Sequence, residues 1–160
     1  LKSHGNDIRL LAVGPFESSE YEAEIKTLAD DLQVAELIEW TGFQTDVNQF
    51  FQRMDLFALP SLFGEGLPMV VLEAMANGVP VVAAKVEGVT EAIRNGEDGI
   101  IFEPGSPEQL ADAIQQFVDR QVDWHSIRQS AIDRQQNSFS ELSMATGVAR
   151  VYQRLLTKAY

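Results

Sequence analysis

Apolar residues along the chain occur in two patterns, short continuous runs and longer stretches with helical spacing. The continuous runs predict buried strands at 8–13, 37–41, 55–59, 79–84 and 99–102. Apolar positions three or four residues apart predict helices at 18–32, 47–54, 67–77, 90–95, 106–118, 124–135 and 140–158. Apolar strands that alternate with helices are typical of a parallel sheet covered on both faces. The pattern therefore predicts an α/β, Rossmann-like fold of about five parallel strands, with additional helices at the carboxyl end.

Three of the predicted helices begin with recognisable capping residues. Ser19 stands three positions before Glu22, and Ser138 stands three before Glu141, which is the spacing of a capping box. Ser106 precedes a proline, and proline at the first helical position loses no hydrogen bond. These residues predict where the helices start.

Composition narrows the class of protein. The chain has 160 residues, which suits one domain, and it carries 24 acidic against 12 basic residues, a net charge of −12. Such a surface repels phosphate backbones, which argues against binding nucleic acid or an anionic membrane. There is no cysteine, and no apolar run approaches the roughly 20 residues of a membrane anchor. We therefore expect a soluble protein and a reducing, cytoplasmic setting.

The residues that follow the predicted strands are the candidate binding residues, because ligands of parallel sheets bind beyond the carboxyl ends of the strands. These segments are Gly14–Pro15–Phe16, Gly42–Phe43–Gln44, the loop 60–65 and the segment 85–90.

The segment GEGLPMVVLEAMANGVPVV, at 64–82, contains two acids in apolar surroundings, Glu65 and Glu73. Pro68 is suited to the first position of the helix, and Gly66 permits close approach of a ligand. The N–H groups near Leu67, Met69 and Val70 would then form an anion site that the helix dipole strengthens. Glu73 stands five residues after Pro68, which places it about 7 Å further along the helix axis than that proline. A ligand with phosphates at the helix start and hydroxyl groups at each end fits this spacing.

A structural interpretation of the same acids remains open on spacing alone. Glu65 would favour the helix dipole, and Glu73 would share a solvated stripe with Asn77. Glu97 and Asp98 are interpreted as a solvated acid pair. The two histidines are too isolated for a metal site, and no metal is expected.

The stretch PSLFGEGLPMVVLEAMANGVPVVAAKVEGVTEAI closely resembles the E-x7-E region of retaining glycosyltransferases with the GT-B fold, the family four group. The segments IRLLAVGPF, LIEWTGF and NGEDGIIFEPGSPEQLADAI resemble the flanking parts of the same domain, so the resemblance covers nearly the whole chain.

The resemblance implies roles for individual residues. Glu65 would contact the donor sugar at the catalytic face, and Glu73 would hold the ribose hydroxyls. Other donor contacts are implied for Gly14, Pro15, Gly42, Phe43, Gln44, Ser61, Gly66, Leu67, Pro68, Met69 and Val70. The donor would be a UDP-, GDP- or ADP-sugar as co-substrate, with no cofactor and no metal.

The resemblance also implies that residues 1–160 are one donor-binding domain, the carboxy-terminal part of a two-domain enzyme whose acceptor domain is missing here. The final helix would return to that partner, which would leave its apolar residues partly exposed; packing on this domain is the alternative. The full enzyme would be cytoplasmic or peripheral to a membrane, and the isolated fragment inactive.

Two departures from the family keep other functions open. The family's Arg and Lys that neutralise the diphosphate are not matched, and its Gly-Gly turn is replaced by Glu87–Gly88. A non-catalytic module that binds nucleotide sugars or a protein partner is therefore the alternative, and an epimerase of the same fold is disfavoured.

Overall fold

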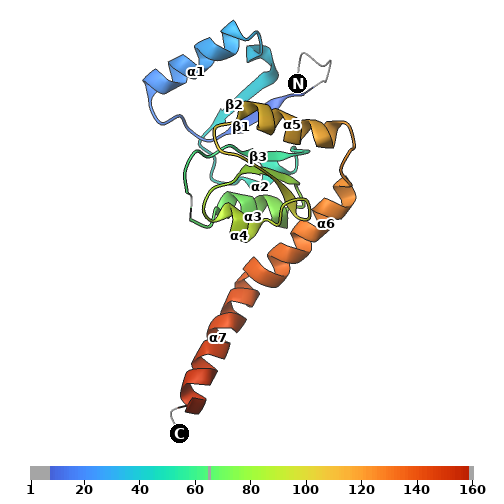
Figure 1. Cartoon of the computed structure of the whole chain (residues 1–160). Helices are drawn as coiled ribbons and strands as arrows, with labels where there is room; N and C mark the ends of the chain where they lie inside the picture. Colours follow the sequence, from blue (N-terminus) through green and yellow to red (C-terminus); the bar gives the residue numbers. More distant parts are fainter. Residues whose placement is uncertain (1–7, 65, 159–160) are drawn as a thin grey trace. The chain divides into compact units, whose positions relative to one another are not determined.

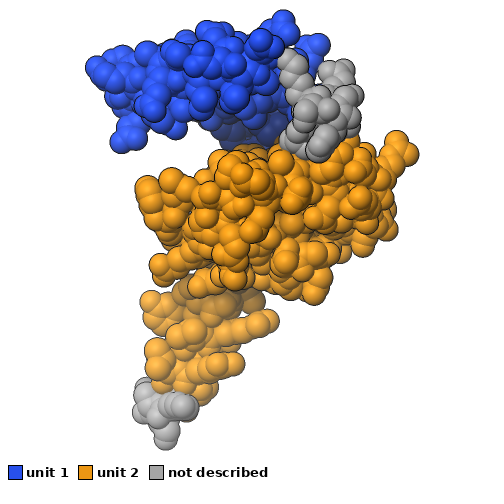
Figure 2. Space-filling model, turned by 45° about the horizontal axis from the view of Figure 1, so that its top comes forward, with its two compact units in different colours: residues 1–54 blue, residues 55–160 orange. Residues whose placement is uncertain are grey.

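The computed structural model describes residues 8–64 and 66–158. The chain divides into two compact units, 1–54 and 55–160, coloured blue and orange in Figure 2. All five expected strands form and all of them pair in parallel, which confirms the α/β class. They belong to two sheets, one of two strands and one of three.

Unit 1 is built on the parallel pair β1 (Leu10–Val13) and β2 (Ile38–Gly42). Helix α1 (Ser19–Asp31) and the short 3-10 helix η2 (Ala35–Leu37) connect the two strands, and α2 (Asn48–Phe51) follows β2. The strands of unit 1 are at most half-buried, and Leu10 is exposed.

Unit 2 contains the sheet β3 (Phe57–Leu59), β4 (Val81–Ala84) and β5 (Gly99–Phe102), in that spatial order. Helices α3 (Met69–Ala76) and α4 (Val89–Ala92) lie on one side of this sheet and α5 (Pro107–Val118) lies on the other (Figure 1). Every residue of the central strand β4 is fully buried. Covering on both faces explains why β4 reads as a continuous apolar run.

The chain ends in a nearly continuous helical segment. Helix α6 (Trp124–Arg134) passes into a π-helix, η3 (Gln135–Phe139), and then into α7 (Glu141–Lys158). Figure 1 shows these elements in orange to red. α6 packs against α3, whereas the apolar side chains of α7 are exposed: Leu142, Met144, Val148, Val151, Tyr152, Leu155 and Leu156. Of the two alternatives for these residues, exposure and packing on this domain, the structure shows exposure. No helix among the described residues has both the length and the apolarity that a bilayer crossing needs.

Two of the three predicted capping serines differ from the structure. The cap of α1 is Ser18, whose side chain accepts a hydrogen bond from the Tyr21 N–H, and Ser19 is already helical. The cap of α7 is Ser140, whose side chain accepts a hydrogen bond from the Ser143 N–H. The predicted cap, Ser138, lies inside the π-helix, so the observed cap stands two residues later. Ser106 caps α5 as predicted.

Pro68 is the N-cap of α3 and not its first helical residue, because its ψ of 106° is extended and Met69 opens the helix. The shift is one residue. It leaves the Pro68 carbonyl as the acceptor for the N–H groups of Val71 and Leu72.

Candidate functional site

The predicted binding residues fall into two groups, one in each unit. In unit 1 they occupy the carboxyl ends of β1 and β2. The Gly14 N–H donates to the Gly42 carbonyl at 2.9 Å, which joins the two turns. The Gln44 side-chain amide donates to the Thr41 carbonyl at 2.7 Å, and Phe43 is 74% exposed. The turns are thus held by backbone acceptors, while Phe43 is presented to solvent.

A shallow cavity of about 490 Å³ lies beside these turns within unit 1. Its lining comes from the loop after β1, the start of α1 and the end of β2: Pro15, Phe16, Ser18, Ser19, Glu22, Lys26, Trp40 and Gly42. The Phe16 ring lies 5.1 Å from the Trp40 ring, centroid to centroid. Lys26 pairs with Glu22 at 2.6 Å. The cavity therefore has an aromatic wall, and its two charged residues neutralise each other. It includes Pro15 and Gly42 from the predicted set.

The second group lies in unit 2 on the loop between β3 and α3 and on α3 itself. Ser61 is half-buried, and Gly66 and Leu67 are exposed directly before the buried Pro68. Met69 and Val70 open the helix, so their N–H groups have no acceptor within it. Glu65 lies outside the described residues. The described part of this loop leads into a helix start whose N–H groups can receive an anion.

Glu73 occupies the second turn of α3 and is half-buried. Its backbone carbonyl accepts hydrogen bonds from Asn77, at 3.0 Å from the backbone N–H and 2.9 Å from the side-chain amide. Within the described parts of the chain, no side chain forms an ion pair or a hydrogen bond with the Glu73 carboxylate. The carboxylate is therefore available as an acceptor for a ligand.

The loop between β4 and α4 packs directly on this part of the chain. Gly88 has a φ of 85°, and a Cβ at Gly88 would overlap the carbonyl oxygen of Gly66. Only glycine combines that backbone conformation with so close an approach. The conformation of the Gly66 loop therefore depends on the absence of a side chain at Gly88.

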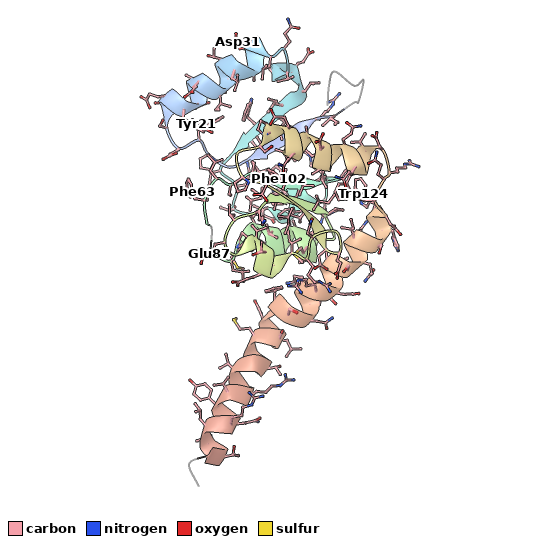
Figure 3. The ribbon with its side chains drawn as sticks, in the orientation of Figure 1. Tyr21, Asp31, Phe63, Glu87, Phe102 and Trp124 are labelled. Carbon is pink, nitrogen blue, oxygen red and sulfur yellow. The ribbon has the colours of Figure 1, made fainter. Side chains whose placement is uncertain are left out.

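Glu87 precedes that glycine and lies beside Gly64. A Cβ at Gly64 would stand 3.1 Å from the Glu87 Cβ and 3.3 Å from its Oε2. Figure 3 labels Glu87 and Phe63 on the same side of unit 2. The Glu87 side chain is exposed, and among the described residues none pairs with its carboxylate. A second acid with no described partner thus borders the loop that enters α3.

Asp98 was expected to be solvated, and the structure shows the opposite. Its side chain is fully buried, and the Arg94 side chain donates to its carboxylate at 2.6 and 2.7 Å. The Ser130 hydroxyl donates at 2.7 Å from α6, and Arg134 lies 3.4 Å away. Burial pushes the pKa of Asp98 upward, but the hydrogen bonds from Arg94 and Ser130 outweigh burial and hold the pKa below its usual value.

The Asp98 cluster fixes elements next to the candidate site. The Arg134 guanidinium donates at 2.6 Å to the carbonyls of Glu91 and Ala92, at the end of α4. The carbonyls at the end of so short a helix have no backbone N–H partner within it, so the arginine supplies their hydrogen-bond donors. The cluster therefore ties α6 to α4, the helix whose N-cap is Gly88.

A second shallow cavity of about 390 Å³ lies in unit 2, at the outer side of β5. Its basic residues are already paired: Lys85 lies 3.2 Å from Glu103, and Arg94 bonds Asp98. Among the described residues no group of three or more histidines and acids is arranged to hold a metal ion.

Comparison with known proteins places this architecture in a family. Residues 1–136 match the model of the family described as Glycosyl transferases group 1. The chain belongs to this family. It is 30% identical over 147 residues to the lipopolysaccharide core biosynthesis mannosyltransferase LpsB of Rhizobium meliloti, and 32% identical over 133 residues to the putative colanic acid biosynthesis glycosyltransferase WcaL of Salmonella typhimurium.

Solved structures of the family share the fold. The Anabaena HepE structure with UDP matches at a TM-score of 0.86 and 26% identity over 92% of this chain and 41% of that one. The HepE structure with UDP-glucose matches at a TM-score of 0.81 and 27% identity. These matches confirm that the parallel α/β architecture is that of GT-B glycosyltransferases.

The chain spans less than half the length of these two curated relatives. The alignments cover 91% of this chain but 41% of LpsB, and 79% of this chain but 31% of WcaL.

Proposed function

We propose that this chain is the donor-binding half of a glycosyltransferase that moves a sugar from a nucleotide diphosphate sugar to an acceptor. The observation that carries the proposal is the start of α3. There a glycine-containing loop enters a helix capped by the buried Pro68, and Glu73, whose carboxylate has no partner among the described residues, follows in the second turn. Family membership and the nucleotide complexes of HepE support the same function.

In this proposal each end of the donor meets a different group. The diphosphate lies against the free N–H groups of Met69 and Val70, where the helix dipole favours negative charge. Glu73 accepts hydrogen bonds from the ribose hydroxyls, about 5–6 Å further along the axis than these N–H groups. The sugar lies toward Glu65, on the side of Gly66.

Chemistry in this proposal is largely electrostatic. Breaking the bond between the sugar and the diphosphate leaves negative charge on the phosphate oxygens, and aligned N–H groups stabilise that charge without reorganising. We propose a retaining reaction with Glu65 on the catalytic face of the sugar, as the E-x7-E resemblance implies. Neither a metal nor a cofactor has a role in it.

We propose donor contacts for the unit 1 residues as well. The turns at Gly14–Pro15 and Gly42–Gln44 present backbone groups and the exposed Phe43 ring at the ends of β1 and β2. The base is uracil, guanine or adenine; the UDP-glucose complex of HepE favours testing UDP-sugars first.

We also propose that residues 1–160 act together with an acceptor-binding domain, in a cytoplasmic or membrane-peripheral enzyme, and that the fragment alone does not transfer sugar. The exposed apolar side of α7 supports a return of this helix to such a domain.

The test is calorimetric titration of the full natural protein with UDP-glucose, GDP-mannose and ADP-glucose. At least one donor should bind, and its binding should weaken in a Glu73→Gln variant. Binding together with measured sugar transfer separates the enzyme from a non-catalytic binding module. Absence of binding by all three donors would overturn the proposal.

A further inference from the structure

Glu87 is a charged residue of unit 2 that has no role in the proposed donor contacts. It stands in the loop between β4 and α4, three residues after the last residue of β4. Loops at the carboxyl ends of parallel strands are where ligands bind. A carboxylate at that edge that has no partner among the described residues places a negative charge beside a neighbouring ligand.

The packing of the two loops fixes where Glu87 lies. Gly88 abuts the Gly66 carbonyl, and the Glu87 side chain lies beside Gly64, with its Cβ and Oε2 3.1 and 3.3 Å from the position of a Cβ there. Gly64 and Gly66 directly precede the capped start of α3. Glu87 therefore borders the loop on its upstream side, ahead of the N–H groups proposed to hold the diphosphate.

The charge of Glu87 is not balanced by a described neighbour. Lys85, two residues before it, pairs with Glu103 at 3.2 Å, and Arg94 pairs with Glu97 and Asp98. In the described portion of the chain no cation is paired with the Glu87 carboxylate. A ligand group placed next to it meets a full negative charge at the protein surface.

We propose that Glu87 is a specificity-determining residue that selects neutral donor sugars against sugars carrying a carboxylate. The inference rests on the proposed function, which places the sugar on the Gly66 side of the diphosphate. A carboxylate accepts hydrogen bonds from sugar hydroxyls and repels a second carboxylate, so it favours a hexose over the corresponding uronate.

The experiment compares matched donors on the full natural protein by calorimetric titration at pH 7 and low salt. The probes are UDP, UDP-glucose and UDP-glucuronate, with GDP, GDP-mannose and GDP-mannuronate as the parallel set. The measured quantity is the ratio of the dissociation constants of the uronate donor and the neutral donor.

Glu87→Gln should reduce this ratio roughly fivefold to tenfold, the effect expected for two unit charges several ångströms apart near a surface. Most of the change should be tighter binding of the uronate donor. Glu87→Asp keeps the charge and should keep most of the discrimination. In 1 M salt the difference between wild type and Glu87→Gln should shrink, because salt screens exposed charges.

Asp112→Asn is the matched control. It removes one exposed acid of unit 2 from α5, on the opposite side of the sheet from α3 and α4, and should leave the ratio unchanged.

Titration with the nucleotide alone distinguishes two positions of the Glu87 charge, beside the sugar or beside the diphosphate. If Glu87→Gln tightens UDP, the neutral donor and the uronate donor equally, Glu87 faces the diphosphate and the inference is wrong. An unchanged ratio also overturns it while leaving the proposed function intact. If none of UDP-glucose, GDP-mannose and ADP-glucose binds the wild-type protein, the proposed function fails and the inference fails with it. If ADP-glucose alone binds, the same ratio is measured with ADP-glucuronate.

Discussion

Asp98 and Glu73 are both acidic residues of unit 2, and the fold surrounds them in opposite ways. Asp98 is fully buried and receives hydrogen bonds from Arg94 and Ser130. Glu73 is half-buried and has no ion-pair partner among the described residues. A buried charge without partners would be costly, so the protein itself supplies the partners of Asp98. For the Glu73 carboxylate, we propose that a ligand supplies the partner.

This contrast predicts that the free energy of unfolding and the affinity for the donor depend on different acidic residues. Removing a structural acid should lower the free energy of unfolding and leave the donor preference alone. Removing a ligand-binding acid should do the reverse. The following variants test whether the two regions are independent in this way.

The largest effect is expected for Asp98→Ala. Removing it leaves the Ser130 hydroxyl and the Arg94 and Arg134 guanidinium groups without their shared anion. Because Arg94 is 47% exposed and water can hydrate it, we expect a cost of about 2–3 kcal/mol, the scale of hydrogen bonds to a charged group. Urea denaturation should show this loss. Glu97→Ala is the matched control: Glu97 pairs with the same Arg94 at 2.8 Å but is 60% exposed, so its loss should cost less than about 1 kcal/mol. Equal effects of the two variants would contradict the assignment.

The acid dependence of stability offers a second test of Asp98. Its pKa is lower in the folded protein than in the unfolded chain, so its contribution is fully present above the ordinary carboxyl pKa of 3.8. The contribution is lost as pH falls from there through the folded pKa. The difference in unfolding free energy between wild type and Asp98→Asn should therefore narrow below about pH 4. A difference that stays constant down to pH 2 would contradict this account.

A smaller effect, on both stability and binding, is expected for Gly88→Ala. The backbone there is left-handed, and the new methyl group would overlap the Gly66 carbonyl, so the two loops must separate. We expect a loss of about 2 kcal/mol in unfolding free energy, within the usual range for such strain. Gly96→Ala is the control, because Gly96 is also left-handed but no atom lies within 4 Å of the added Cβ. Gly88→Ala should weaken donor binding and Gly96→Ala should not.

The smallest effect on stability is expected on α7. Leu155 is 61% exposed, so Leu155→Gln should change the unfolding free energy of the 160-residue chain by less than about 0.5 kcal/mol. Ile127→Gln on the buried side of α6 is the contrasting variant and should be strongly destabilising. If Leu155→Gln destabilises the 160-residue chain as much as Ile127→Gln does, the apolar side of α7 is not a free surface.

Local sequence patterns were sufficient for the fold class and for the order of the elements. The buried run Val81–Ala84 and the cap at Ser106 are determined by neighbouring residues, and both were predicted correctly. The start of α1 was displaced by one residue because two adjacent serines, Ser18 and Ser19, compete for the cap. The start of α3 was displaced by one residue because the extended ψ of Pro68 leaves this residue outside the helix.

The site was less predictable where partners are distant in sequence. The spacing of Arg94 and Asp98 was visible, but Ser130 and Arg134 come from a helix more than thirty residues further along. The contact between Gly88 and Gly66 likewise exists only once β3 and β4 lie side by side. Sequence spacing alone could not distinguish a buried acid from a ligand-binding one.

The most direct test of the central claim is calorimetric titration of UDP-glucose, GDP-mannose and ADP-glucose into the full natural protein and its Glu73→Gln and Glu97→Gln variants. For the donor that binds, we predict about a tenfold loss of affinity in Glu73→Gln, the scale of one hydrogen bond to a charged group, and no change in unfolding free energy beyond about 1 kcal/mol. Glu97→Gln should bind as the wild type does. Unchanged donor affinity in Glu73→Gln, or a loss of stability that matches the loss of binding, would contradict the account.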